Sequence, residues 1–305
     1  MKLDTHVHTR HSGYSTIRPL HRVMRESYNT PAGVYQMTRQ RGMDLVTITD
    51  HDTITGALEL ADRPEVIIGC EVTATFPDDR VCVHLNVLGL NDQTFAEVDR
   101  LRADVRELLP YLQRERLFTS LNHVGSSVAG RLTAAHVAAL LPWMNAIEVI
   151  NGSRLPVQNR TAASLAAATG KTPIAGSDAP HRRGVGYTWT EVPGARNREE
   201  FLAGLWRGET AIGGRHGSYF TMAEDILRFS GSFYAEHLAE VARHPLRWRA
   251  QMRWWGGVCG LPLVPVALAG AYLHFLGEER FNHNLLFDLV ARPARVLQAV
   301  PELAA

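Results

Sequence analysis

Lys2-Leu3-Asp4-Thr5-His6-Val7-His8 opens the chain, and the interpretation of the later strands depends on it. In an extended strand alternate side chains share a face, so Asp4, His6 and His8 point to one side and the residues between them to the other. Two imidazoles on one face can bind the same metal ion. A half-buried strand with hydrogen-bonded histidines explains a single His-x-His motif equally well, so the remaining strands must decide.

The composition excludes several classes of protein. Lys and Arg number 32 against 31 Asp and Glu, a formal net charge of +1, so we expect no binding of long nucleic acid. Cys70, Cys82 and Cys259 lack Cys-x-x-Cys spacing, which argues against a disulfide scaffold or a zinc ribbon and suits a reducing cytosol. The chain does not open with a basic segment followed by an apolar one, so we expect no cleaved export signal and a cytoplasmic protein.

Short apolar runs alternate with helical patterns along residues 1–215. Strands are expected at 45–49, 66–70, 81–88, 117–121, 146–150, 172–175 and 187–192. Helices are expected at 30–42, 53–61, 93–116, 133–141, 157–169 and 198–207. About seven strand–helix units predict a mostly parallel, barrel-like α/β domain. We place its boundary near Gly213-Gly214.

The composition changes beyond residue 215, and we expect 216–305 to be a helical appendage. Residues 222–253 predict a helix whose last part is basic, with Arg243, Arg247, Arg249 and Arg253. Residues 254–276 contain no Asp, Glu, Lys or Arg, and about 20 apolar residues suffice to cross a bilayer. A spanning or re-entrant membrane segment, with the upstream arginines as its cytoplasmic flank, is the first interpretation. A membrane-surface or dimer-forming hairpin and a plain core helix are the alternatives, and the oligomeric state is left open.

Groups suited to metal binding recur at or near the strand ends: His6, His8, His51, Glu71, His84, His123, Asp178 and His181. Mixtures of imidazole and carboxylate suit zinc, manganese or iron, and a carboxylate such as Glu71 can bridge two ions. The absence of thiolates from the set argues against a structural zinc site. Because the carboxyl ends of parallel strands meet at one rim, we expect these groups to converge on two or three divalent ions.

With these residues the chain resembles the PHP family, the metal-dependent phosphoesterase domain named for polymerase and histidinol phosphatase. The resemblance covers roughly residues 1–215. Its motifs are Asp4-Thr5-His6-Val7-His8, Thr49-Asp50-His51-Asp52, Gly69-Cys70-Glu71 with His84, Asn122-His123, and Gly176-Ser177-Asp178. The resemblance implies a distorted (β/α)7 barrel with a two- or three-metal site that hydrolyses phosphate esters.

The resemblance also implies which residues hold each ion. The first ion's set is His6, His8, Glu71 and Asp178, and the second's is Glu71, His84 and His123. His51 and His181 would serve a third ion. Two departures bear on that third ion: Gly13 stands where the family's first loop usually supplies an Asp, and His181 is shifted by one position from the family's Asp-x-His motif.

The favoured function is a metal-dependent phosphoesterase that acts on a small phosphorylated compound, such as a nucleotide, sugar phosphate or short oligonucleotide, through a metal-activated water. His51 and His181 are candidates to protonate the leaving oxygen. Four loop residues are candidates to bind the substrate: Arg10, Asn151, Arg154 and Arg182. For each arginine, an ordinary solvated side chain is an equal alternative. Glu148 lies inside its strand and is expected to support the ligands.

Two other functions remain open at this point. A metal-dependent amidohydrolase shares the His-x-His opening and the barrel, but it would normally use a carboxylated lysine as the bridge between its ions. A membrane-tethered, metal-binding regulatory module with weak or lost catalysis is the second alternative, because the first loop and the fourth motif depart from the family pattern.

Overall fold

The computed structural model describes residues 1–14, 24–127 and 131–291, and in this part of the chain six strands form a curled sheet. In sheet order they are β2 (Val46–Ile48), β3 (Val66–Thr75), β4 (Cys82–Leu88), β5 (Phe118–Leu121), β6 (Ala146–Asn151) and β7 (Thr172–Gly176). A small antiparallel sheet is formed by β1 (Lys2–Leu3), β8 (Trp189–Glu191) and β9 (Ala211–Gly213). The predicted α/β class is confirmed.

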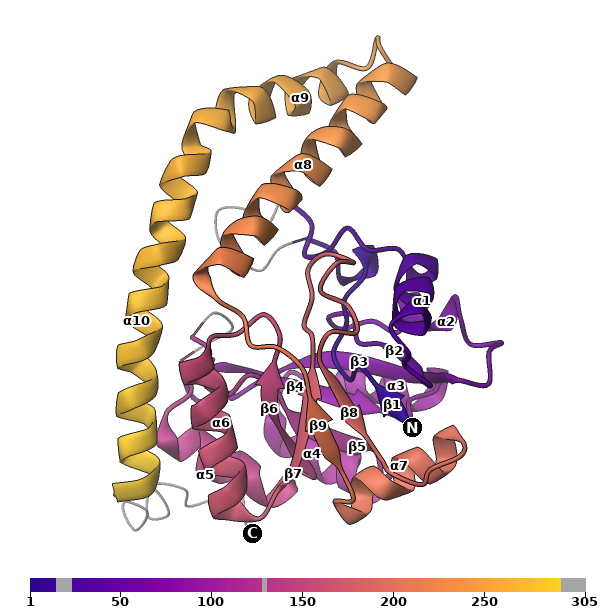
Figure 1. Cartoon of the computed structure of the whole chain (residues 1–305), viewed down its shortest axis with the longest axis vertical. Coiled ribbons are helices and arrows are strands. Elements are labelled where there is room, and N and C mark those ends of the chain that lie inside the picture. The colour runs from indigo at the N-terminus through magenta and orange to yellow at the C-terminus, as the bar shows by residue number, and fades with distance from the viewer. Residues whose placement is uncertain (15–23, 128–130, 292–305) are drawn as a thin grey trace.

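Seven helices of the described chain surround the two sheets (Figure 1). They are α1 (Pro31–Gln40), α2 (Thr55–Leu58), α3 (Asp92–Leu101), α4 (Val105–Arg114), α5 (Ala134–Leu140), α6 (Pro156–Thr169) and α7 (Arg198–Arg207). The single helix predicted over 93–116 is wrong. Asp104 has an extended backbone and its carboxylate accepts from the backbone N–H of Arg106, so it caps a second helix.

The predicted alternation of strand and helix fails between β3 and β4, which form an antiparallel pair. Residues 76–81 make a tight turn in which the backbone N–H of Phe76 donates to Val81 O at 2.8 Å. β4 also runs antiparallel to β5, while the other neighbours in this sheet are parallel. The amino end of β4 therefore lies at the rim where the parallel strands end, which brings His84 to that rim.

Residues 4–8 lie between β2 and β7, the two edges of the curled sheet. The backbone N–H of Asp178 donates to His6 O and that of Thr49 to Val7 O, each at 2.8 Å. A Cβ atom at Gly176 would lie 2.4 Å from His6 Cβ, so glycine is required for this approach. These single contacts join the edges without a continuous ladder. The sheet is a curled half-barrel, and the full (β/α)7 barrel of the prediction is not formed as a hydrogen-bonded ring.

One side of the curled sheet changes from apolar to polar along the strands. In β3 alternate residues run from Ile67 to Glu71, in β4 from Leu88 to His84, and in β6 from Ala146 to Glu148. The apolar residues of this side form one core with Leu3, Phe118, Ile174 and, from α7, Phe201 and Leu205. Because this core packs at one end of the strands, the polar side chains Glu71, His84 and Glu148 lie together at the other end.

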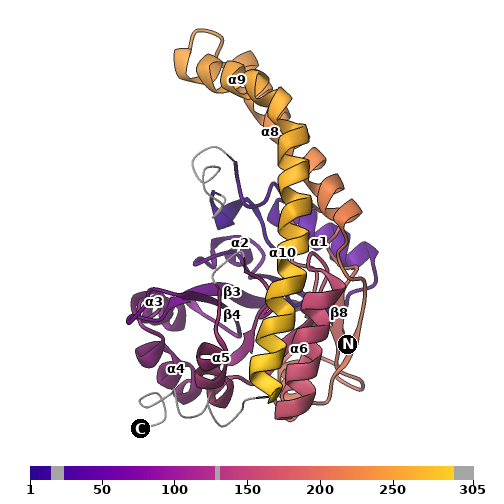
Figure 2. The same ribbon diagram turned by 90° about the vertical axis from the view of Figure 1, so that its left-hand side faces the viewer.

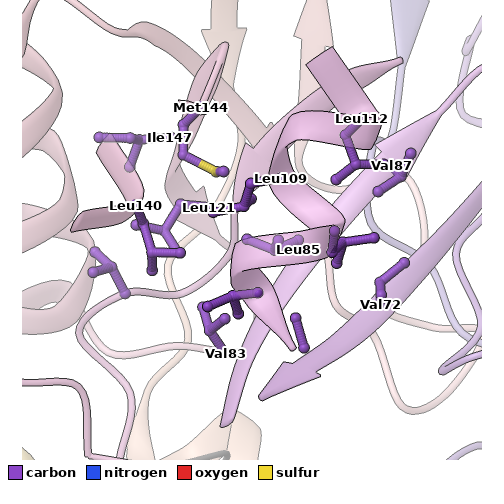
Figure 3. Packing of buried hydrophobic residues seen from close by; sticks show 14 of the residues in the cluster. Val72, Val83, Leu85, Val87, Leu109, Leu112, Leu121, Leu140, Met144 and Ile147 are labelled. Atoms are coloured by element: carbon purple, nitrogen blue, oxygen red, sulfur yellow. The ribbon is translucent and has the colours of Figure 1, made fainter. Parts of the chain in front are cut away.

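A second core lies on the opposite side of the sheet, under α3, α4 and α5. Leu109 and Leu112 of α4 lie among the side chains of β4, Leu85 and Val87 included (Figure 3). Leu108, Leu109 and Leu112 are all buried, as expected for the inner stripe of an amphipathic helix. Helix cover on this side and the apolar core on the other hold the strand ends in place.

The C-terminal part is helical as predicted, but residues 222–253 do not form one helix. α8 (Tyr219–Arg243) ends before Pro245, and α9 (Trp248–Gly260) follows. A 3-10 turn at Leu261–Leu263 then leads into α10 (Val264–Ala291). α8 rises from the domain, α9 crosses beyond it, and α10 returns beside α6 (Figures 1 and 2). Residues 292–305 of the predicted appendage lie outside the described residues.

The continuous run Trp248–Leu285 is long and apolar enough to cross a membrane by length and composition alone. Its mean hydropathy is 1.7 in the most apolar part, and 0% of that part is buried. The alternative that 254–276 forms a plain core helix is therefore wrong.

Candidate metal centre

Seven of the eight predicted ligands converge at the polar rim of the curled sheet: His6, His8, His51, Glu71, His84, His123 and Asp178. Within the described chain, three groups of possible ligand atoms each lie within 4.8 Å of one another. They are His6, His8 and Glu71; His6, His123 and Asp178; and His51, Glu71 and His84. Glu71 and His6 belong to two groups each, so the three groups form one cluster.

Four atoms of this cluster face a common point. Nε2 of His6 and Nε2 of His8 lie 3.1 Å apart. Glu71 Oε2 lies 3.2 Å from the first nitrogen and 3.1 Å from the second, and Asp178 Oδ1 lies 3.7 Å and 3.4 Å from them. Ligands that bind one ion with bonds of about 2.1 Å are separated by about 3.0 to 3.4 Å in octahedral or tetrahedral geometry. Four of the five separations lie in this range, and that between Asp178 Oδ1 and His6 Nε2, at 3.7 Å, is slightly longer, so the four atoms suit one divalent cation.

The other oxygen of Glu71 faces a second set of imidazoles. Glu71 Oε1 lies 3.3 Å from His84 Nδ1 and 3.0 Å from His123 Nε2. His51 Nδ1 lies 3.3 Å from Glu71 Oε2. The Nδ1 atoms of His51 and His84 are buried and make no hydrogen bond among the described residues. Buried nitrogens without hydrogen bonds, turned toward a carboxylate, suit metal ligation. The residues present thus fit divalent metals, with Glu71 between the two sets.

Hydrogen bonds fix the orientation of the first two imidazoles. His6 Nδ1 lies 2.9 Å from Glu148 Oε1, and His8 Nδ1 lies 3.0 Å from Ser12 Oγ. Ser12 Oγ in turn donates to Asp50 Oδ1 at 2.7 Å, so it accepts from His8. With the proton on Nδ1 of each ring, the Nε2 lone pairs are free to bind a cation.

Glu148 also organises the second set. Its Oε2 accepts from the backbone N–H of His123 at 3.0 Å and from Asn151 Nδ2 at 2.9 Å. The expectation that Glu148 supports the ligands agrees with these contacts. Asn122 Nδ2 donates to Glu71 Oε1 at 2.9 Å, a contact that the sequence interpretation missed although Asn122 belongs to the quoted motif.

Two of the clustered residues have backbone conformations that are uncommon for side chains other than glycine. φ is 26° at His123 and 46° at Asp178, just beyond β5 and β7. Such conformations persist where surrounding contacts enforce them and are enriched at functional sites. At Asp178 the enforcing contacts are the bond from its N–H to His6 O and the donation from Asn151 Nδ2 to its Oδ2 at 3.1 Å.

Carboxylates control the protonation of the first two imidazoles. Burial lowers the pKa of His6, but Glu71, Asp178 and Glu148 outweigh burial and hold that pKa well above its usual value. Burial acts on His8 in the same way, but hydrogen bonds that its ring donates to the carboxylates of Asp178 and Glu71 outweigh burial and raise the pKa of His8 to about 10. Without a bound cation, protons on His6 and His8 therefore balance the negative charge of the carboxylates.

The pKa values of Glu71, His51 and His123 are lowered. Burial favours a neutral Glu71, but the surrounding imidazoles hold the pKa of Glu71 well below its usual value. Burial lowers the pKa of His51 well below its usual range and also lowers the pKa of His123. His51 and His123 are thus neutral imidazoles beside an ionised carboxylate, which is the protonation state that metal binding requires.

His181 lies outside the cluster, contrary to the prediction that it is a ligand. The carbonyls of Ala179 and Pro180 accept from Asn29 and Ser27, which holds the loop on a path that leaves His181 at the rim. His181 is half-buried, its Nδ1 accepts from the N–H of Arg183, and burial lowers its pKa. Compared with the family's Asp-x-His motif, this chain has one more residue between Asp178 and His181, and His181 lies away from the clustered ligands.

The four predicted substrate-binding residues occupy different positions. Arg154 Nη2 lies 3.0 Å from Asp178 Oδ2, at the cluster. Asn151 is fully buried and donates to Glu148 and Asp178, so it braces these two carboxylates, and its contact with a substrate stays a prediction. Arg10 and Arg182 are exposed on the loops that surround the rim.

Comparison with known proteins gives a match to one family model and to one curated relative. A family model described as PHP-associated matches residues 156–210. An uncharacterized protein of Methanocaldococcus jannaschii is 34% identical over 80 residues, which cover 25% of this chain and 46% of that protein. The chain thus matches about half the length of this curated relative.

Two solved structures share the fold. The first is a two-domain protein of Bacteroides vulgatus containing a predicted PHP-like metal-dependent phosphoesterase. It has a TM-score of 0.50 and 19% identity, over 74% of this chain and 68% of that one. The second is PsfC of Pseudomonas syringae, with a TM-score of 0.53 and 16% identity, over 77% of this chain and 98% of that one.

Fold and cluster together define a histidine- and carboxylate-rich metal centre at the rim of a curled α/β sheet. Residues 156–210 match the PHP-associated model, and the fold is similar to that of a protein containing a predicted PHP-like metal-dependent phosphoesterase.

Proposed function

We propose that this protein is a metal-dependent hydrolase that cleaves a phosphate ester of a small phosphorylated compound. The observation that carries the proposal is the position of Glu71, whose Oε2 faces His6 and His8 while its Oε1 faces His84 and His123. A carboxylate between two imidazole sets suits two adjacent divalent ions, of manganese, iron or zinc. His51 supports a further ligand position on the same carboxylate.

Divalent ions held by these residues would supply an activated water and neutralise charge on the phosphoryl oxygens. Arg154 would bind a phosphoryl oxygen, because its guanidinium lies at Asp178 and its buried Nε makes no hydrogen bond within the described chain. Glu148 and Ser12 would keep the imidazoles in the metal-binding tautomer. His181, on the rim loop, remains a prediction as the proton donor to the leaving oxygen.

A lysine-bridged amidohydrolase centre is less compatible with the structure. Lys2 pairs with Glu191 at 3.8 Å, and Lys171 Nζ donates to Met144 O at 2.8 Å. Neither contact lies in the cluster, and Glu71 already stands between the two imidazole sets. We therefore favour phosphate esters over amides as the substrate class.

Metal analysis and turnover of the same preparations test the proposal. Protein purified without chelator should contain two or more ions of manganese, iron or zinc per chain and hydrolyse p-nitrophenyl phosphate or its bis ester. His8→Ala should lose at least one ion and nearly all turnover, whereas His283→Ala, at an exposed position on α10, should change neither. A full metal complement with turnover of amides alone would support the amidohydrolase, and no turnover at all would support the regulatory module.

A further inference from the structure

α8, α9 and the first half of α10 form a projecting arm, defined here as residues 219–277, that extends away from the two sheets (Figures 1 and 2). The arm begins beside the cluster, because the backbone N–H of Gly217 donates to Arg154 O at 2.8 Å. Along α8, Glu224 pairs with Arg183 at 2.8 Å and Glu236 with Arg25 at 3.0 Å. The arm thus lies along the loops around the rim.

The outer part of the arm exposes an apolar surface that the domain does not cover. Trp255 is 61% exposed, Leu263 63% and Leu273 67%, and residues 254–276 carry no charged side chain among Asp, Glu, Lys and Arg. Continuous exposed apolar surface of this kind marks a contact with a membrane or another protein.

Arginines at the bend between α8 and α9 favour a membrane over another protein as the contact. Leu246, 97% exposed, and the exposed Trp248 stand among Arg243, Arg247 and Arg249, which are exposed as well. Arg249 lies over the Trp248 ring. Arginine beside tryptophan and leucine is the composition of helices that lie at the surface of anionic bilayers, since the cations reach lipid phosphates while the apolar groups enter the acyl region.

The length of the straight apolar helix argues against a complete crossing. From Val264 to Gly277 α10 has 14 residues, a length of about 21 Å, whereas the hydrocarbon core is about 30 Å thick. Beyond Gly277 the helix is fixed to the domain, since buried Glu278 accepts from Gln158 Nε2 and buried Asn282 donates to Gly125 O, each at 2.7 Å. At its other end, the turn at Leu261–Leu263 bends the chain into α9.

We propose that the arm inserts its apolar α9–α10 corner into one leaflet of an anionic membrane and so presents the metal cluster to phosphate esters carried by lipids. The substrate part rests on the proposed function. A lipid substrate is supported by the short distance between the end of α8 and the rim loop. Only seven residues of α8, about 10 Å, continue beyond the contact of Glu236 with Arg25 of that loop. Lipid head groups at the arm would therefore lie near the rim.

Vesicle sedimentation of the full chain tests insertion independently of catalysis. The protein should sediment with vesicles of phosphatidylcholine and phosphatidylglycerol, and less with phosphatidylcholine alone. The double variant Leu263→Glu and Leu273→Glu should bind about tenfold less or weaker still, because both side chains leave the apolar phase. Leu58→Glu, at an exposed position on α2, should bind as the unmodified chain does. Equal vesicle binding by the arm variant would overturn the proposal.

The free thiols provide a second readout without any substitution. Cys259 is exposed on the arm, Cys82 is half-buried in β4, and Cys70 is buried. Vesicles should slow the reaction of Cys259 with a water-soluble maleimide about tenfold and leave Cys82 unchanged. Unchanged labelling of Cys259, combined with a dimer in sedimentation velocity that the arm variant dissociates, would instead assign the surface to a second copy of this chain.

Two activity measurements separate the lipid substrate from the proposed function. Turnover of soluble p-nitrophenyl phosphate should be equal in the unmodified chain and the arm variant, since the arm does not form the cluster. Hydrolysis of phosphatidate in vesicles should be lost in the arm variant alone. Vesicle binding without turnover of either ester would refute the phosphoesterase and leave insertion standing, whereas turnover of the soluble ester only would refute the lipid substrate.

Discussion

Glu148 Oε1 accepts a hydrogen bond from Nδ1 of His6 at 2.9 Å, from a position inside β6 where neither group is exposed to solvent. The bond selects the tautomer in which Nε2 of His6 faces Glu71. The same carboxylate accepts from the backbone of His123, so one residue aligns both imidazole sets. Residues that orient ligands in this way contribute to metal affinity although they do not touch the metal.

Glu148→Gln should lower metal affinity about 10- to 100-fold while the fold is retained. The amide nitrogen would face either His6 Nδ1–H or the donors from His123 and Asn151, so one donor–donor contact is unavoidable. Competition with a chelator measures the change. Glu97→Gln, at a half-buried position on α3 that pairs with Arg100 and not with the cluster, is the matched control. Equal affinity in both variants would show that Glu148 does not orient the ligands.

Arg154→Gln should lower kcat/KM for a phosphate ester about 10- to 100-fold and leave the metal content unchanged. The guanidinium lies beside Asp178 but is not one of the clustered ligand groups, so its loss removes phosphate binding and not metal binding. Arg182→Gln, on an exposed loop position, should have little effect. Loss of metal in Arg154→Gln would assign Arg154 to the support of Asp178.

Metal-free protein should lose stability as pH rises from about 6.5 toward 10. Because the pKa of His8 is raised to about 10, its stabilising contribution is complete below the unfolded value near 6.5 and disappears as pH rises through the folded value. The pKa of His6 is raised as well, while Glu71 stays ionised throughout this window.

Bound metal would take the place of these protons, so the metal-loaded protein should not show this loss. Thermal unfolding with manganese and with chelator, compared from about pH 6.5 to 9, should therefore give a difference in Tm that widens with pH. A constant difference would mean that His6 and His8 do not exchange protons for metal.

Gly176→Ala should destabilise the protein by about 1 to 3 kcal/mol and reduce metal content. Its Cβ would lie 2.4 Å from His6 Cβ and 2.7 Å from His6 N, so residues 4–8 would have to move away from β7. Gly231→Ala in α8, where the added Cβ meets nothing within 4 Å, should be neutral or stabilising. Chemical denaturation and metal analysis together check the pair, and a neutral Gly176→Ala would contradict the required close approach.

Asn282→Ala should destabilise the protein by about 1 to 3 kcal/mol, because its buried amide donates to Gly125 O, which would lose this partner. Asn284→Ala, at an exposed position two residues nearer the C-terminus, should have little effect. Equal stability of the two variants would indicate that α10 is not held by this contact.

The residues of the cluster could be inferred from sequence because most of them stand near the end of a strand, where residue type and local spacing are informative. The same reasoning could not separate the ligands from residues nearby. Whether His181 reaches the cluster depends on Ser27 and Asn29, which lie about 150 positions away in the chain. Local patterns contain no information on such contacts.

Two errors in the fold predicted from the sequence have local causes. The antiparallel β4 follows from the turn at 76–81, and an apolar run alone does not give strand direction. The break between α3 and α4 depends on Asp104 acting as a cap within an amphipathic pattern that continues through it. Turn and cap residues compete with periodicity, and periodicity was the stronger signal.

The bonds from α10 to the 124–127 loop impose an order of events during synthesis. His6 and His8 leave the ribosome first, whereas Glu278 and Asn282, which bind Ser127 and Gly125 a few residues beyond His123, are translated last among these residues. All seven clustered side chains are therefore translated before α10 can fix the loop that follows His123. Folding of that part of the rim is thus completed only after translation of the helix that also completes the arm.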